Sequence, residues 1–146
     1  MLGWGVGDIV AILNLAVTVH AAYKDGPQKY RHISDEVSSF QIILDKAMQY
    51  FNSTTLSDKD RQESQKVLKG CQSVLEDLNS FIEKYKSSAS ATKSQKIKAV
   101  KLGTEDFDTL RARLISNTGL LNRFILRFDI FTISVECIML ISLLQL

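Results

Sequence analysis

The side chains that could carry catalytic or metal chemistry are few and widely spaced. Cys71 and Cys137 have no metal-ligand or C-x-x-C spacing, so we expect buried thiols of a protein in a reducing compartment. His20 and His32 lie on different predicted helices, and neither has an H-E-x-x-H motif or a group of carboxylates beside it. These residue types and spacings predict no metal centre and no cofactor.

Motifs for nucleotide binding and for nucleophilic catalysis are not found either. No G-x-x-x-x-G-K-[ST] occurs, and Gly3, Gly5 and Gly7 precede a predicted helix with no strand before them. The spacing of serines and cysteines indicates no partner base for a nucleophile. Cys71 falls on an apolar helical stripe, which predicts an inert thiol. We therefore expect a protein that is not an enzyme and has no small-molecule substrate.

A cluster of lysines is the clearest charged feature of the sequence. From Lys84 to Lys101 the chain carries six lysines and no acid, around the run SSASATKS. Nucleic-acid recognition calls for arginine and aromatic side chains, which this stretch lacks except for Tyr85, and the net charge is only +2. No nucleic-acid partner is therefore expected. Two interpretations stay open, a solvated basic loop or a short basic helix on an anionic membrane surface. The candidate surface residues are Lys93, Lys96, Lys98 and Lys101.

The elements that must position these residues are predicted to be helices. A chain of 146 residues with 45% hydrophobic and 23% charged residues fits one domain with a core. Apolar residues recur every three or four positions, as in a bundle helix. The predicted helices are 1–23, 28–52, 59–86 and 104–127, with a basic loop or short helix at 86–103. We expect a single all-α bundle over 1–127, with about four long helices, a short basic helix and an apolar C-terminal extension.

Details of the helix ends and contacts can also be predicted. Asp25, Gly26 and Pro27 should end the first helix, and Ser57 or Asp58 should cap the helix that starts near Lys59. Thr104 should cap the last bundle helix. Gly70 lies inside a predicted helix and is expected to mark a close contact between helices.

The two ends of the chain are its most apolar parts. The first helix is apolar on nearly every face between Ile9 and Val19, which is typical of a central core helix or of one that enters lipid. No Lys or Arg precedes Lys24, and Asp8 stands where a signal peptide would be basic, so secretion is not expected.

The tail at 128–146 has no Lys or Arg and is long enough to span a bilayer, although Asp129 and Glu136 would each cost a few kcal/mol near its centre. Three interpretations of the tail stay open. It could be an anchor, a buried helix beside the first one, or a segment outside the domain.

Four stretches resemble a known family, in order and spacing. They are GVGDI at Gly5 to Ile9, YKDGPQKY at Tyr23 to Tyr30, LNSFIEKY at Leu78 to Tyr85 and LISNTGLLN at Leu114 to Asn122. Over about residues 3 to 126 the chain is similar to the N-terminal domain of fungal NLR-type (STAND, NACHT-associated) proteins.

That resemblance implies a HeLo-like helical bundle related to domains that execute programmed cell death in fungal innate immunity and heterokaryon incompatibility. It implies a cytoplasmic domain that oligomerises with like domains and is recruited to the plasma membrane, where residues 1–23 are released and inserted. The candidate insertion residues are Gly3, Gly5, Gly7, Ile9, Leu13 and Val17. The alternatives are a homotypic adaptor module whose first helix stays in the core, and a small membrane protein anchored by its C-terminal segment.

Overall fold

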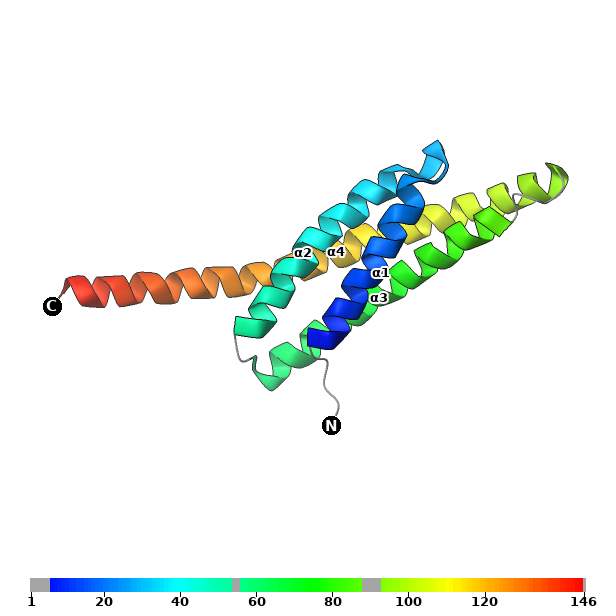
Figure 1. Ribbon diagram of the computed structural model, residues 1–146. Coiled ribbons are helices and arrows are strands. Elements are labelled where there is room, and N and C mark those ends of the chain that lie inside the picture. The colour runs from blue at the N-terminus through cyan, green and yellow to red at the C-terminus, as the bar shows by residue number, and fades with distance from the viewer. Residues whose placement is uncertain (1–5, 54–55, 88–92, 146) are drawn as a thin grey trace.

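The computed structural model describes residues 6–53, 56–87 and 93–145, and every regular element within these ranges is a helix (Figure 1). The helices are α1 (Val6–Lys24), the short 3-10 helix η1 (Gln28–Tyr30), α2 (His32–Ser53), α3 (Asp58–Ser87) and α4 (Lys93–Leu144). Each long helix packs on two others, because α1 and α4 both contact α2 and α3. The predicted all-α bundle is confirmed.

The core is made by one apolar stripe from each long helix, and those of α2 and α4 follow the predicted helical repeat. All four long helices turn one apolar side inward, so that residues three or four positions apart meet in the centre. The buried side chains of α1 are Ile9, Ile12, Ala16, Val19 and Tyr23. Those of η1 and α2 are Tyr30, Ile33, Val37, Phe40, Leu44 and Ala47. On α3 they include Leu68, Cys71, Val74, Leu75, Leu78 and Ile82, and on α4 Phe107, Leu110, Leu114, Leu121, Phe124 and Ile125.

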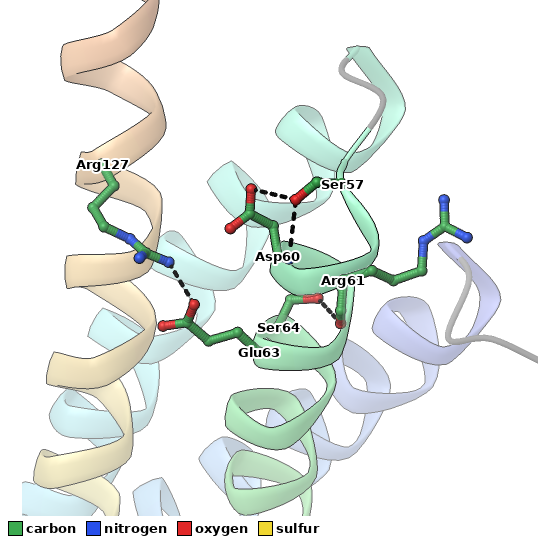
Figure 2. Close-up of polar contacts among 6 residues, drawn as sticks. All are labelled: Ser57, Asp60, Arg61, Glu63, Ser64 and Arg127. Carbon is green, nitrogen blue, oxygen red and sulfur yellow. Dashed lines mark hydrogen bonds and ion pairs between the residues drawn. The ribbon is translucent and has the colours of Figure 1, made fainter.

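Two of the predicted helix ends have a clear physical cause. After α1, a Cβ at Gly26 would lie 2.9 Å from the Ala22 carbonyl oxygen, so the turn needs glycine. At the start of α3, the Asp60 backbone N–H donates to Ser57 Oγ at 3.2 Å, and the Ser57 hydroxyl donates to the Asp60 carboxylate at 2.9 Å (Figure 2). Ser57 is therefore the N-cap of α3.

Gly70 does mark a close contact between α3 and α4. A Cβ at this position would lie 2.8 Å from Asn117 Oδ1. The Asn117 amide donates to the Gly70 carbonyl oxygen at 3.4 Å. The glycine lets α4 bring a polar side chain against the backbone of α3.

The prediction of a separate short basic helix followed by a capped helix at Thr104 is wrong. α4 runs without a break from Lys93 to Leu144, so Thr104 lies inside it and is not a cap. Lysine, alanine and glutamine are good helix formers, and one glycine at 103 costs only about 1 kcal/mol, which is too little to end a helix with such neighbours. The predicted helix 28–52 is shifted as well, since Gln28–Tyr30 forms a 3-10 turn before α2.

Ion pairs attach α4 to both α2 and α3. Arg111 pairs with Glu36 of α2 at 2.8 Å, while Arg113 pairs with Asp77 of α3 at 2.7 Å. Arg127 pairs with Glu63 of α3 at 3.0 Å (Figure 2). Beyond Arg127, α4 continues away from the other helices (Figure 1).

The interpretation of the tail as a buried helix beside α1 is wrong for its described side chains. Residues 134–145 are exposed throughout. The side chains at 128–133 lie outside the described residues.

Candidate functional site

The candidate insertion residues of the N-terminal segment do not form one surface. Ile9 is buried in the core, Leu13 is half-buried against it, and Val17 is 55% exposed. Gly7 is exposed, and a Cβ there would meet nothing within 4 Å. Gly3 and Gly5 lie outside the described residues. In this conformation α1 is a core helix with one side toward solvent.

A buried hydrogen bond ties the end of α1 to α3. The Tyr23 hydroxyl donates to the Leu78 carbonyl oxygen at 2.8 Å. Burial, with the nearby Tyr30 as a second cause, raises the pKa of Tyr23 well above its usual value, so the hydroxyl stays protonated and keeps donating. Any movement of α1 out of the bundle must break this bond.

The four candidate surface lysines fall in the first turns of α4. Lys93, Lys96, Lys98 and Lys101 all belong to the helix backbone, while their side chains lie outside the described residues. Residues 93–101 are therefore helical, and their part in binding an anionic surface stays a prediction.

The chemistry-bearing side chains are dispersed. Cys71 is buried, and burial raises the pKa of its thiol to about 12, which makes it a poor nucleophile. Cys137 is exposed, so the expectation of a buried thiol is wrong there. His32 is half-buried, with its ring edge-on to Phe107 at 5.7 Å between centroids. Within the described residues, no three His, Cys, Asp or Glu side chains could hold a metal ion together.

The outer end of α4 is the most unusual surface of the described protein. We call residues 134–145 the α4 extension. Its large apolar side chains are exposed: Val135, Ile138, Met139, Leu140, Ile141, Leu143 and Leu144. Ile138 to Ile141 are consecutive and 55–63% exposed, and four consecutive residues point to about three quarters of a helix circumference. A single neighbouring helix could therefore not cover the extension, whereas lipid could.

A groove lies between α3 and α4, close to where α4 leaves the bundle. It has a volume of about 450 Å³ and is lined by Glu63, Val67, Leu120, Arg123, Phe124, Leu126 and Arg127. We call it the arginine groove. The Arg127 guanidinium lies 5.1 Å from the centre of the Phe124 ring. It also binds the Glu63 carboxylate, as Figure 2 shows.

Sequence reasoning missed the arginine groove, although Arg123 and Arg127 are spaced four residues apart on one helix. The groove and the pairing of Arg127 with Glu63 of α3 required knowledge of which helices are neighbours.

Among the described residues, no helix combines the length and the hydropathy that a membrane span requires. Comparison of the chain with protein-family models, with curated proteins and with solved structures found no match.

Proposed function

We propose that the chain is a non-catalytic signalling domain, similar to the N-terminal domains of fungal NLR-type proteins, and that it acts by binding membrane lipid. The exposed aliphatic side chains of the α4 extension carry this proposal. Moving such side chains from water into hydrocarbon is favourable by roughly 25 cal/mol for each Å² that is removed from water. The sequence resemblance supports a signalling role that ends at a membrane.

The size of the extension fits shallow insertion. Residues 134–144 form a helix segment of about 16 Å, which is about half the thickness of a bilayer's hydrocarbon core. Glu136 lies near the inner end of this segment, toward the bundle, so it can stay at the head-group level while Leu140 to Leu144 enter one leaflet.

Insertion of α1, which the resemblance implies, is the harder step. Burial of Ile9, Ile12 and Val19 stabilises the folded chain by about 1.5–3 kcal/mol for each side chain, and this stabilisation is lost when α1 leaves the core. The Tyr23 bond to Leu78 would also break. We therefore propose two steps in order. The α4 extension contacts lipid first, and α1 is released later, after several domains have gathered on the membrane.

Flotation of the full chain with phosphatidylcholine vesicles tests the first step. Ile138→Glu places a charge where lipid is expected, and Ile42→Glu is a matched control on α2, because both isoleucines are 63% exposed. A charge in hydrocarbon costs about 3 kcal/mol, so Ile138→Glu should lower binding more than tenfold while Ile42→Glu leaves it unchanged. Equal flotation of the two variants, or no flotation of the natural chain, would contradict the proposal.

A homotypic interaction module is the second candidate, and the outer side of α1 favours it. That side carries Val10 and Val17, which are 40% and 55% exposed, and no Asp, Glu, Lys or Arg lies between Asp8 and Lys24. Such a surface can bind a like domain while the inner side of α1 stays in the core.

Sedimentation velocity at high protein concentration tests the homotypic candidate. Val17→Glu should abolish a dimer or larger complex, and Ile115→Glu on α4, at 52% exposure, is the matched control. A natural chain that remains a monomer and binds no related domain would exclude this function.

A further inference from the structure

We propose that the arginine groove binds the head group of an anionic phospholipid when the α4 extension lies in the membrane. This inference rests on the proposed function and adds a site and a lipid class to it. It comes from the composition, the charge and the position of the groove.

The composition of the groove suits an amphiphile. Val67, Leu120, Phe124 and Leu126 supply an apolar surface, and Leu120 and Leu126 are 42% and 45% exposed. Arg123 and Arg127 lie beside this surface on the same helix. A lipid would place its glycerol and upper acyl chain on the apolar side chains and its phosphate against guanidinium.

Of the two arginines that line the groove, Arg123 is the one whose charge can bind an anion. Arg127 is compensated by Glu63, which it binds through Nη2 at 3.0 Å. Arg123 donates from Nε to the Gly119 carbonyl oxygen at 3.5 Å, and no carboxylate pairs with it in the described part of the chain. Guanidinium is planar and matches phosphate oxygens with two parallel hydrogen bonds. Arg123 is therefore the expected phosphate ligand, with Arg127 beside it.

The position of the groove places it at the level of lipid head groups. Arg127 lies about 10 Å along the helix from Ser134, where the α4 extension begins. No Lys or Arg follows Arg127 in the sequence. Basic residues that flank an inserted apolar segment normally sit at the head-group level and favour anionic lipid.

A second copy of the chain fits the groove less well than lipid does. The α4 extension of another copy could cover the apolar side chains, but it carries no anion except Glu136. The Arg123 guanidinium would then be desolvated against aliphatic side chains, which is unfavourable. A phospholipid supplies both the apolar part and the negative charge.

The test compares flotation with vesicles of phosphatidylcholine alone and of phosphatidylcholine with phosphatidylserine. The natural chain should bind the anionic vesicles more tightly, and Arg123→Gln should lower that binding about fivefold while leaving binding to phosphatidylcholine unchanged. Lys69→Gln is the control, because it removes the same charge from an exposed position of α3 that is about 200° around the helix from Val67. Thermal unfolding confirms that both variants fold.

Arg123→Lys separates a phosphate site from general attraction to a charged surface. It keeps the charge but loses the planar fork, so a site in the groove predicts a loss of at least twofold. Full binding by Arg123→Lys, or an equal loss in Lys69→Gln and Arg123→Gln, would overturn the inference and leave the proposed function intact. Failure of the natural chain to bind either kind of vesicle would overturn both.

Discussion

Gly70 and Gly119 are both helical glycines, and their surroundings differ. At Gly70 an added Cβ would lie 2.8 Å from Asn117 Oδ1, whereas at Gly119 it would meet nothing within 4 Å. Replacing a helical glycine with alanine normally gains about 1 kcal/mol. We expect Gly119→Ala to gain most of this free energy, and Gly70→Ala to gain none, since Asn117 must move and its hydrogen bond to Gly70 is lost. Urea unfolding of the two variants measures the difference, and equal stabilisation would show that the contact is not tight.

The buried thiol of Cys71 makes stability depend on pH. Burial raises its pKa from 9.0 to about 12, so the folded chain holds this proton more firmly than the unfolded chain. Its contribution to stability is therefore complete below pH 9 and is lost as the pH rises toward 12, by at most about 1.4 kcal/mol for each pH unit. Cys71→Ala should make the free energy of unfolding fall less steeply over this range.

The control for the pH prediction is the exposed cysteine. Cys137→Ala should keep the full alkaline loss of stability, because its thiol is exposed in the folded chain. Tyr23 adds alkaline sensitivity of the same sign to every variant, since its pKa is also raised. An identical slope in Cys71→Ala and Cys137→Ala would show that the Cys71 thiol ionises normally.

At the scale of the elements, α1 has a buried side and an exposed side. Ile12 is 1% exposed and Val17 is 55% exposed. A charge at Ile12 would be buried without a partner, so Ile12→Glu should unfold the bundle, while Val17→Glu should change its stability by less than about 0.5 kcal/mol. Circular dichroism during heating distinguishes the two. A folded Ile12→Glu variant would show that α1 is only loosely packed.

The sequence was enough to predict the apolar stripes and the cap of α3. Tyr30, Phe40 and Leu44 follow the helical repeat, and a repeat sustained over several turns defines the inner side of a helix whatever its neighbours are. The cap of α3 depends on residues only three positions apart, so the local sequence limited it to Ser57 or Asp58, and the structure shows Ser57.

The continuity of α4 could not be predicted in the same way. Gly103 and Thr104 look like the end of one helix and the start of another, and that pattern is local. The pattern does not report how the helix-forming residues around it offset the cost of one glycine, about 1 kcal/mol, so that α4 continues through it. The arginine groove was missed for a different reason, because its lining comes from two helices that are far apart in sequence.

At the scale of the whole molecule, the chain has two apolar helical segments, α1 and the α4 extension, and they differ in how far their side chains are exposed to solvent. α1 buries most of its large apolar side chains in the core, whereas the α4 extension exposes its own. The extension lies at the end of α4 that projects away from the other helices (Figure 1). The extension can meet lipid without any change in the bundle. α1 cannot, so insertion of α1 would depend on an equilibrium between a packed and a released state.

Tyr23→Phe tests whether that equilibrium matters for membrane activity. It removes the donor to the buried Leu78 carbonyl oxygen and should cost the packed state about 1 kcal/mol. The population with α1 released would then rise about fivefold. If membrane damage requires α1, leakage of a dye from vesicles should rise by a similar factor while flotation stays the same.

Ile33→Val is the control for Tyr23→Phe, because it destabilises the core by about 1 kcal/mol from α2 rather than from the end of α1. Greater leakage with Tyr23→Phe than with Ile33→Val ties the activity to the release of α1. Equal leakage from the two variants would assign it to general loosening of the bundle. Leakage that neither variant changes would mean that α1 stays packed and that the α4 extension alone acts on the membrane.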